Sequence, residues 1–503
     1  MIGALVYSLM YLYFGVLTVR FLLPRHRPLN RIWLGLSLGL LEEMWLPALG
    51  AFWLSFGVEA HVFGAAVLFA LTLAAWFLRD RRDPAGWDDR ERELLRQMLI
   101  FCIPLTLLGI WLQYSHVMRT DAAGNWHVGQ STYGDLPMHL SFITGLVGKK
   151  FPADYPFYPG ARLSYPFLTD SLSSTFLVLG CSLQAAVILP AVLMMALCYM
   201  GVLVLGRDMT GGRRTALLAA ALALPQLFGF TFRQVFEKEG GTGNFLRLQF
   251  NWVNNPGGRG MRDFYIWFYV KNIGLPFVLL MLACFEKDAH MRRILMAALP
   301  IVILGETVRF QPNEYDNNKL FYLAYLLCTM VISDYAAILY RKLKGVRARP
   351  LMAAAALVCF FLSAGLTLWR ECVSSYQAFS ASAVEAGVFV RDNTEEDSVF
   401  LSGTQHLNPV SSIAGRTTVC GPDLWLYWHG IDTSERKMDI AAFMTDPEAN
   451  LEILEKYGVD YIYVSSYERS SYSVDLTAMD ALFERVFENR EAVVYSVREA
   501  KEE

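Results

Sequence analysis

The chain has 503 residues, of which 54% are hydrophobic and only 18% are charged, and its mean hydropathy is +0.32. Soluble domains carry about 25% charged residues, so this composition argues against an ordinary soluble protein and excludes a disordered tail or a collagen-like repeat. The formal net charge of −3 averages over two unlike parts, because residues 1–370 carry +11 and residues 371–503 carry −14. A hydrophobic, basic first part and an acidic second part indicate a membrane domain followed by a soluble domain.

Ten stretches of about 20 mostly apolar residues are predicted to cross a membrane. They lie near 2–24, 32–55, 60–78, 97–114, 183–205, 215–231, 265–285, 293–308, 318–340 and 350–369. Alternate connections in this series hold 21 of the 34 basic residues of the membrane part, at 20–31, 79–96, 207–214, 287–293 and 341–349. Because positively charged loops remain in the cytoplasm, we expect a bacterial cytoplasmic membrane protein whose N-terminus, long loops (115–182, 232–264, 309–317) and C-terminal domain lie outside.

One apolar stretch, residues 166–182, is interrupted by Asp170, several serines and Gly180. If it crossed the membrane, the basic segment 206–214 would fall on the outer side and break the charge pattern. We therefore predict a helix that lies along the outer membrane surface.

From about residue 380 the sequence has the pattern of a small α/β domain. Short β-like runs at 398–401, 461–464 and 492–496 alternate with helical stretches at 447–457 and 477–488, and Gly458 stands where a helix would end. The predicted fold is an α-helical polytopic membrane protein with about ten spans and a C-terminal extracytoplasmic α/β domain. Its predicted parts are 1–96 (three N-terminal spans and a cytoplasmic loop), 97–370 (a membrane catalytic module) and 371–503.

Asp135 and His139 stand four residues apart in the first long loop, in the stretch GDLPMH. If a helix begins at Leu136, the two side chains lie on one face of it. A partly desolvated carboxylate at the lipid–water boundary suits a general base. Alternatively, Asp135 caps this helix, a position that Asp favours, with Pro137 in the first turn. The spacing does not separate these two interpretations, which are compatible.

The same two residues could instead be ligands of a divalent metal ion. Two ligands do not make a site, so further ligands would have to come from His116, Asp121, His127 or Asp154. We favour a site without metal and expect that no cofactor is required.

A second polar cluster, GETVRFQPNEYDNNKLFY, occupies residues 305–322, where one predicted span ends and the next begins. Arg309 and Lys319 would meet anionic lipid head groups at this depth, Arg as a bidentate fork for phosphate and Lys as a point charge. Alternatively, both only extend toward water and pair with Glu314 or Asp316. We expect the substrate cavity to be lined by Glu306, Gln311, Glu314, Asp316, Tyr133 and Tyr165.

The loop 233–263 is rich in glycine, but its glycines follow no predicted strand and precede no GK[ST]. It does not therefore indicate a nucleotide P-loop. A loop over a cavity fits better, with Arg247 and Arg259 as secondary phosphate ligands.

Glu42 and Glu43 fall in the middle of a predicted span, LLEEMWLP. Ionisable residues at this depth are costly and usually functional. They favour an alternative function, a transporter or a flippase for lipid-linked sugars, although either could simply form a hydrogen bond inside the helix bundle.

A polar-aromatic stretch at 401–430 contains His406, Arg416, Trp425, Trp428 and His429. Aromatic faces suit carbohydrate, so the stretch could line a sugar site, although such residues are commonly the core and rim of a domain. The C-terminal part shows no G-x-S-x-G motif and no Ser/His/Asp order.

Three segments carry a resemblance to a known superfamily. YPFYPGARLSYPFLTDSLSSTFLVLG follows the early Asp135, SLQAAV at 182–187 opens a span, and that span ends in LGRDMTGGRRTALLAAALAL. Together they resemble the C-type (GT-C) glycosyltransferases, particularly bacterial relatives of the protein mannosyltransferases. The resemblance covers roughly residues 97–340.

The resemblance implies an integral membrane enzyme that uses a polyprenyl-phosphate-linked sugar as donor. The first-loop catalytic carboxylate of the superfamily would correspond to Asp135, and its later phosphate-binding residues to Arg309 or Lys319. The chain departs from the superfamily pattern in reading DLPMH without an Asp-Glu pair and in carrying three extra spans, 2–78. The expected activity is inverting transfer of a hexose or pentose to an extracytoplasmic acceptor hydroxyl in the cell envelope, with a non-catalytic surface-assembly protein as a further alternative. We expect no nucleic-acid partner.

Overall fold

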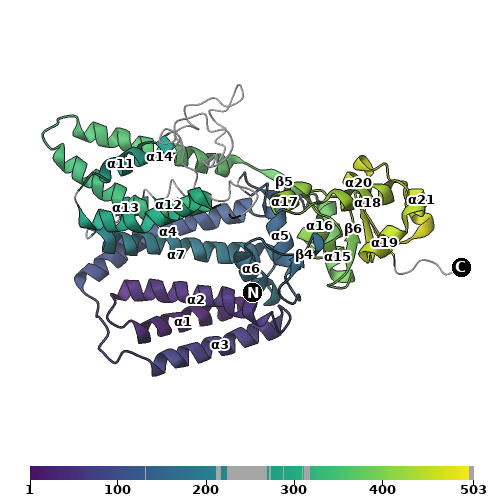
Figure 1. Cartoon of the computed structure of the whole chain (residues 1–503), viewed down its shortest axis with the longest axis horizontal. Helices are drawn as coiled ribbons and strands as arrows, with labels where there is room; N and C mark the ends of the chain where they lie inside the picture. Colours follow the sequence, from purple (N-terminus) through teal and green to yellow (C-terminus); the bar gives the residue numbers. More distant parts are fainter. Residues whose placement is uncertain are drawn as a thin grey trace. The chain divides into compact units, whose positions relative to one another are not determined.

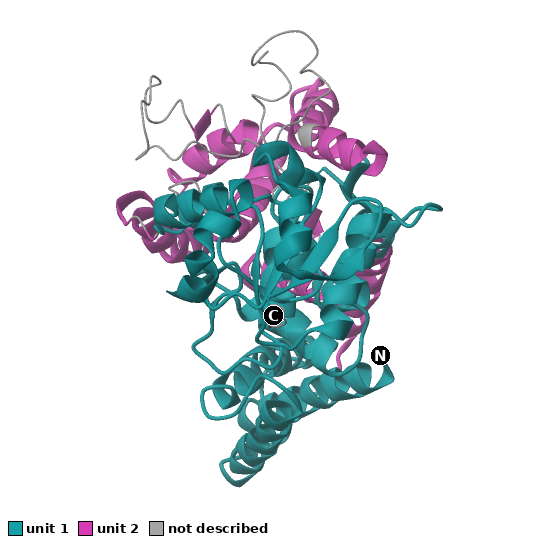
Figure 2. Cartoon of the chain, turned by 90° about the vertical axis from the view of Figure 1, so that its right-hand side faces the viewer, with its two compact units in different colours: residues 1–86, 108–193, 375–503 teal, residues 87–107, 194–374 magenta. Residues whose placement is uncertain are grey.

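The computed structural model is mostly helical and describes residues 1–130, 132–210, 217–221, 223, 269–270, 273–286, 288–308, 310 and 318–497. The chain forms two compact units (Figure 2). Unit 1 comprises Met1–Gly86, Leu108–Leu193 and Ser375–Glu503, and unit 2 comprises Trp87–Leu107 and Met194–Ser374. These units cut the chain differently from the predicted parts 1–96, 97–370 and 371–503, which stay a prediction.

Within the described ranges, seven helices are long and apolar enough to cross a membrane. They are α1 (Ile2–Leu22), α2 (Pro28–Gly50), α3 (Val58–Phe77), α4 (Asp89–His116), α7 (Leu183–Thr210), α13 (Asn318–Lys342) and α14 (Arg349–Val373). They confirm seven predicted spans and make the chain a multi-pass membrane protein. The predicted span 293–308 falls in α12 (Ala289–Thr307) and the end of 265–285 in α11 (Leu275–Ala283), while most of 215–231 lies outside the described residues.

Helices α1, α2 and α3 lie side by side as a bundle (Figure 1). A Cβ on Gly39 would lie 2.3 Å from the carbonyl oxygen of Tyr11, and one on Gly15 would lie 2.4 Å from that of Gly35. Real Cβ atoms do not approach backbone this closely, so the backbones of α1 and α2 touch only because these positions are glycine. The backbones of α1 and α2 are therefore in direct contact at these glycines.

Unit 2 is helical throughout its described part. Helix α12 packs on α13, and α11 packs on α13 and α14, around a core that includes Phe321, Met330 and Val331. The buried guanidinium of Arg207 pairs with Glu91 and, at 2.9 Å, with Asp208.

The first long loop folds into α5 (Leu136–Gly145), the hairpin β3 (Asp154–Tyr155) and β4 (Tyr158–Arg162), and α6 (Leu168–Val178). Helix α6 has 11 residues, about 17 Å at 1.5 Å per residue, so it is too short for the roughly 30 Å hydrocarbon core. Residues 166–182 therefore do not cross, as predicted. The amino group of Met1 donates to the carbonyl oxygen of Gly180 at 3.1 Å, so the N-terminus lies beside this loop.

The C-terminal α/β domain is built on a five-stranded sheet in the order β7 (Thr417–Thr418), β6 (Val399–Leu401), β8 (Tyr461–Val464), β10 (Val493–Ser496), β9 (Glu484–Glu488). Strand β6 runs parallel to β7 and β8, and the β10 pairings are antiparallel. The three predicted strands are confirmed. The helical segments are α15 (Ala381–Asn393), α16 (Pro409–Ser412), α17 (Asp423–Trp428), α18 (Ser434–Thr445), η2 (Glu448–Asn450), α19 (Glu452–Tyr457), α20 (Ser466–Ser471) and α21 (Leu476–Leu482).

One predicted helix of this domain, 477–488, is wrong in its second half. Helix α21 ends at Leu482, and Glu484–Glu488 forms the edge strand β9. In this strand Arg485 and Phe487 are half-buried between exposed neighbours, which is the two-residue period of a strand. The prediction for 447–457 is confirmed by η2 and α19, and Gly458 ends α19 in the left-handed conformation with φ 59°.

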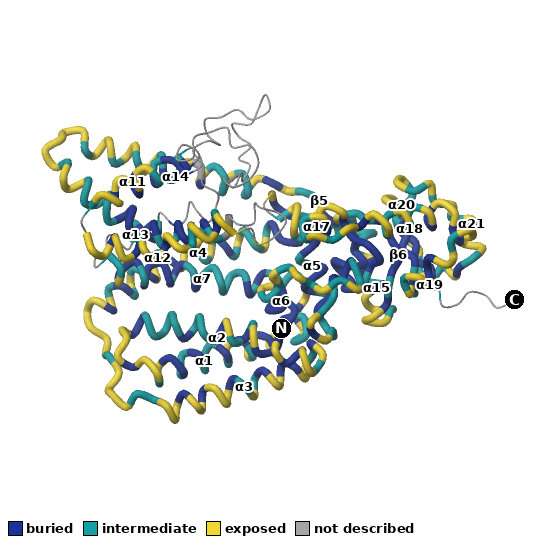
Figure 3. Tube along the Cα trace, viewed as in Figure 1, coloured by how far each residue is buried: buried dark blue, intermediate teal, exposed yellow. Residues whose placement is uncertain are grey.

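The first long loop and the C-terminal domain interlock within unit 1. Strands β1 (Arg119–Thr120) and β2 (Trp126–Val128) form one sheet with β5 (Tyr376–Phe379). The amide of Thr418 donates to Pro156 at 2.9 Å and that of Gly421 to Phe157 at 2.7 Å, so the loop covers the β7 edge. Figure 3 shows buried residues concentrated around β6, α16 and α5.

Candidate functional site

Asp135 directly precedes α5, yet its side chain does not cap the helix. Among the described residues its carboxylate accepts no capping hydrogen bond, and the residue is exposed. A capping carboxylate accepts from the second or third amide of the helix, and Pro137 removes one of these donors. The backbone oxygen of Asp135 accepts from the amide of His139 at 3.1 Å. The interpretation of Asp135 as a side-chain cap of α5 is therefore wrong.

His139, one turn further along α5, is hydrogen-bonded to a carboxylate, Asp170, that was not among the predicted site residues. Its Nδ1 lies 3.0 and 3.2 Å from the two carboxylate oxygens of Asp170 on α6, and Asp170 is only 5% exposed. The ring of Tyr165, a predicted cavity residue, lies 5.8 Å from the imidazole, edge to face. A lone carboxylate inside an apolar stretch was the available signal, since such a group needs a partner.

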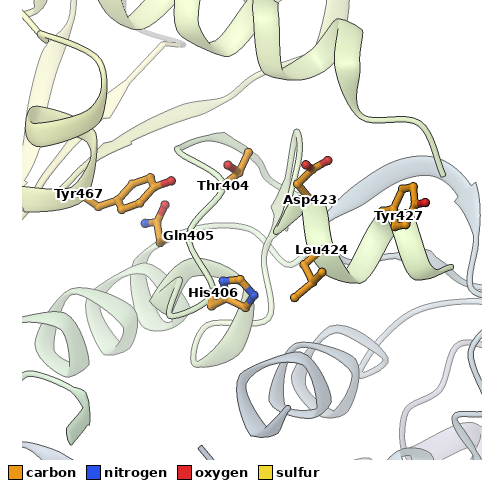
Figure 4. A pocket seen from close by; sticks show the side chains of 7 residues that line it. All are labelled: Thr404, Gln405, His406, Asp423, Leu424, Tyr427 and Tyr467. Atoms are coloured by element: carbon orange, nitrogen blue, oxygen red, sulfur yellow. The ribbon is translucent and has the colours of Figure 1, made fainter. Parts of the chain in front are cut away.

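A pocket of about 450 Å³ opens at the carboxyl end of the parallel half of the sheet (Figure 4). Its lining residues all follow a parallel strand: Thr404, Gln405 and His406 follow β6, Asp423, Leu424 and Tyr427 follow β7, and Tyr467 follows β8. In open α/β sheets, ligands bind outside the carboxyl ends of the strands, where loops that leave neighbouring strands diverge. We call it the carboxyl-edge pocket.

Side-chain hydrogen bonds hold the loops around the carboxyl-edge pocket. Glu468, fully buried, accepts from the amide of Gly403 at 2.7 Å and from that of Ser465 at 2.8 Å, and so ties the loop after β6 to the loop after β8. On the β7 side, Thr433 and Lys437 donate to the Asp423 carboxylate. These two hydrogen bonds hold the pKa of Asp423 below its usual range, so it is a carboxylate at neutral pH.

His406 connects Asp135 with the carboxyl-edge pocket. Burial lowers the pKa of its imidazole, and the negative charge of Asp135 acts in the opposite direction. Its ring stands edge to face against Trp425 at 4.9 Å. The interaction places the exposed carboxylate before α5 and the pocket in one neighbourhood of unit 1, which spacing in the sequence did not predict.

Two other residues of the polar-aromatic stretch 401–430, Arg416 and His429, serve the domain itself. The guanidinium of Arg416 is buried and donates to the carbonyls of Ala414, Arg391 and Thr394. His429 packs between two tyrosines of the first loop. The stretch 401–430 thus contains residues of the domain core and rim, and it also contains six residues that line the carboxyl-edge pocket.

Most of the predicted phosphate and cavity residues lie outside the described residues: Arg247, Arg259, Arg309, Gln311, Glu314 and Asp316. Lys319 belongs to α13, but its side chain is not described. Glu306, in the last turn of α12, accepts a hydrogen bond from Tyr269. Tyr133 is exposed and its ring lies 5.2 Å from that of Tyr376.

The residues considered as additional metal ligands are engaged elsewhere. Asp121 accepts from the amides of Ala123 and Asn125 and from His127, and the hydrogen bond from the Asn125 side chain is the main cause that lowers its pKa to about 2. Asp154 accepts from Gly160 and Arg162. In the described ranges no three His, Cys, Asp or Glu residues gather closely enough to hold an ion.

Glu42 and Glu43 lie in α2 inside the tightly packed bundle. Glu43 is 1% exposed and accepts from the hydroxyl of Ser8 at 2.5 Å. In the described part of the chain, one carboxyl oxygen of each glutamate is buried without a hydrogen-bond partner. These contacts are those of carboxyl groups inside a bundle.

Comparison with known proteins finds no matching family model and no match among the curated proteins. Among solved structures the chain is similar to the oligosaccharyltransferase of Archaeoglobus fulgidus, tethered with an acceptor peptide containing the NVT sequon and in the apo form. The tethered form is 13% identical over 98% of this chain and 62% of its own, with a TM-score of 0.29. The apo form is 13% identical over 96% of this chain and 61% of its own, with a TM-score of 0.28. The chain thus spans less than two thirds of those proteins, and so slight a likeness leaves the activity to be argued from its own residues.

Proposed function

We propose that the chain is a membrane glycosyltransferase that moves a sugar from a polyprenyl-phosphate donor to an extracytoplasmic acceptor hydroxyl. The observation that carries the proposal is Asp135: its carboxylate is exposed, does not cap α5, and acts on His406 at the rim of the carboxyl-edge pocket. A carboxylate with this freedom can accept a proton from a bound hydroxyl.

In the proposed reaction, the acceptor oxygen forms a bond to C1 of the sugar while the bond from C1 to the phosphate oxygen breaks. The hydroxyl proton passes to Asp135, and the lipid phosphate leaves with the electron pair. Displacement in one step inverts the anomeric centre. The proposal assigns the growing phosphate charge to Arg309 and Lys319, with Arg247 and Arg259 in support. It requires no cofactor, because the donor carries one phosphate and no nucleotide.

We also propose a role for His139, whose ring is oriented by Asp170. The two hydrogen bonds from one imidazole nitrogen to a buried carboxylate hold the ring in a single orientation. We therefore assign His139 to the acceptor side of the site as a positioning residue.

The test is Asp135→Asn in membrane vesicles supplied with polyprenyl-phosphate hexoses and pentoses labelled in the sugar. We expect transfer of label to fall by about 10²–10⁴-fold, the contribution of a positioned general base, with insertion and amount of protein unchanged. Asp83→Asn, at an exposed aspartate between α3 and α4, is the matched control and should transfer normally. Full transfer by Asp135→Asn would contradict the proposal.

The same assay separates the alternatives. A transporter or flippase would move lipid-linked sugar without a covalent product, and would be sensitive to Glu42→Gln or Glu43→Gln. A surface-assembly protein would tolerate alanine at Asp135 and Arg309 but not loss of the C-terminal domain.

A further inference from the structure

We infer that the carboxyl-edge pocket binds a saccharide, so that the acceptor in the proposed reaction is a glycan. The acceptor role rests on the proposed function, whereas binding of a saccharide to the pocket does not. Two tyrosines and several neutral polar groups line the pocket, no Lys or Arg is among its described lining residues, and the proposed base Asp135 lies near His406.

Two exposed aromatic rings stand at opposite ends of the pocket in Figure 4. Tyr427 is 60% exposed and Tyr467 36% exposed, far more than a tyrosine that serves a domain core. A pyranose ring has an apolar C–H face and a rim of hydroxyl groups. An exposed phenol ring offers the apolar surface that such a face requires, and pockets for small ligands commonly combine aromatic walls with a few polar groups.

The polar groups between the two rings match hydroxyl groups. Thr404 and Gln405 can each donate and accept, Asp423 accepts only, and a neutral His406 does one of each. Gln405 lines the pocket, and its Oε1 atom is buried and has no hydrogen-bond partner in the described part of the chain. A ligand with several adjacent hydroxyls can satisfy such a mixed set, because every hydroxyl both donates and accepts.

The charge of the lining argues against an anionic ligand. Among the described residues that line the pocket there is no Lys or Arg, and Asp423 carries a negative charge. Lys437, the cation bonded to Asp423, is already paired at 3.0 Å. Phosphate recognition depends on Arg or Lys, so the pocket suits a neutral saccharide rather than the phosphate of the donor.

A peptide acceptor fits this edge less well. Extended peptides commonly bind by adding a strand to an open sheet edge. The edge strand next to the pocket, β7, has two residues, and Pro156 and Phe157 of the first loop already accept hydrogen bonds from Thr418 and Gly421 there. No open edge therefore runs along β7, within the described residues, for a peptide to extend.

The pocket also lies near the proposed base. His406 lines the pocket and lies within the electrostatic reach of Asp135. A saccharide held between Tyr427 and Tyr467 would thus present hydroxyl groups on the side where the proposed base is located. The pocket of about 450 Å³ has room for one or two sugar rings.

The experiment measures saccharide binding to the full chain in nanodiscs, without donor. Saturation-transfer NMR is recorded with methyl hexosides, disaccharides and Ser/Thr heptapeptides as the probes. We expect the wild type to bind one or more saccharides, and expect Tyr427→Ala and Gln405→Ala each to weaken that binding at least tenfold. Met438→Ala, which removes an exposed side chain of α18 outside the pocket lining, is the control and should bind as the wild type does.

The outcomes separate this inference from the proposed function. Saccharide binding that ignores both pocket variants, or a Ser/Thr peptide that binds and is lost in Tyr427→Ala, would overturn the inference. Asp135→Asn should keep saccharide binding while losing transfer. If the wild type binds saccharide through Tyr427 but transfers no sugar from the donor, the proposed function fails and the saccharide site stands. If the wild type transfers sugar but binds no saccharide in this pocket, the proposed function stands and the saccharide site fails.

Discussion

The α1–α3 bundle and the carboxyl edge of the sheet both belong to unit 1, and they differ in how far their carboxyl groups are exposed. In the bundle, glycines let α1 and α2 touch, and Glu43 is enclosed with Ser8 as its donor. At the sheet edge, buried Glu468 holds the loops while Asp423 and Asp135 stay exposed. A carboxylate that holds structure is buried and bonded, whereas one that can exchange protons with a ligand must be reachable.

The largest effect should come from breaking the edge at Glu468. In Glu468→Gln one amide oxygen can still accept from Gly403 or Ser465, but the amide NH₂ then faces the other N–H donor. We expect a loss of about 3 kcal/mol of stability, because hydrogen bonds to a charged group contribute about 1.5–3 kcal/mol each. The measurement is the thermal unfolding midpoint in detergent, together with the saccharide binding described above, which should weaken as the loops separate.

Glu448→Gln is the matched control for this variant. Glu448 is exposed in η2 of the same domain, and an exposed substitution there should change stability by less than about 0.5 kcal/mol. An unfolding midpoint for Glu468→Gln equal to that of Glu448→Gln would mean that Glu468 does not hold the pocket loops.

A smaller effect should follow from separating α1 and α2. In Gly39→Ala the new Cβ would lie 2.3 Å from the Tyr11 carbonyl oxygen, so the helices must move apart. Overpacking of this kind costs about 1–3 kcal/mol, read as a lower unfolding midpoint with saccharide binding retained. Gly345→Ala, where a Cβ meets no atom within 4 Å, is the control. Loss of saccharide binding in Gly39→Ala would show that the bundle and the sheet edge are not independent.

The two regions also differ in how well the sequence predicts them. The spans were predictable because a membrane helix is a local pattern of about 20 apolar residues. Strands 398–401, 461–464 and 492–496 were predictable for the same reason, since β-like runs and Gly458 are local signals. The error at 484–488 arose because a short edge strand beside a helix has too few residues to show its period clearly.

The candidate functional site, with the carboxyl-edge pocket, could be predicted only in part. Asp135 and His139 were selected from their spacing, and His406 from its aromatic neighbours. The bond from His139 to Asp170 joins residues 31 apart, and the pocket joins loops that follow three different strands, so both depend on tertiary folding that no local pattern carries. Tyr467 and Gln405 gave no signal because surface tyrosines and glutamines are ordinary.

The smallest effect tests the link between Asp135 and the sheet edge itself. Burial lowers the pKa of His406 and the charge of Asp135 opposes that shift, so Asp135→Asn should lower this pKa further. When folding lowers the pKa of a histidine, the folded state has its full stability above the unfolded pKa near 6.5 and loses stability as pH falls through the folded pKa. Asp135→Asn should therefore lose more stability than the wild type in acid and none at neutral pH. Diethyl pyrocarbonate modifies only the neutral imidazole, so labelling of His406 should persist to lower pH in Asp135→Asn, while His26, exposed between α1 and α2, labels identically in both proteins. Identical His406 curves would place Asp135 out of reach of the pocket, and with it the base that the proposed reaction needs.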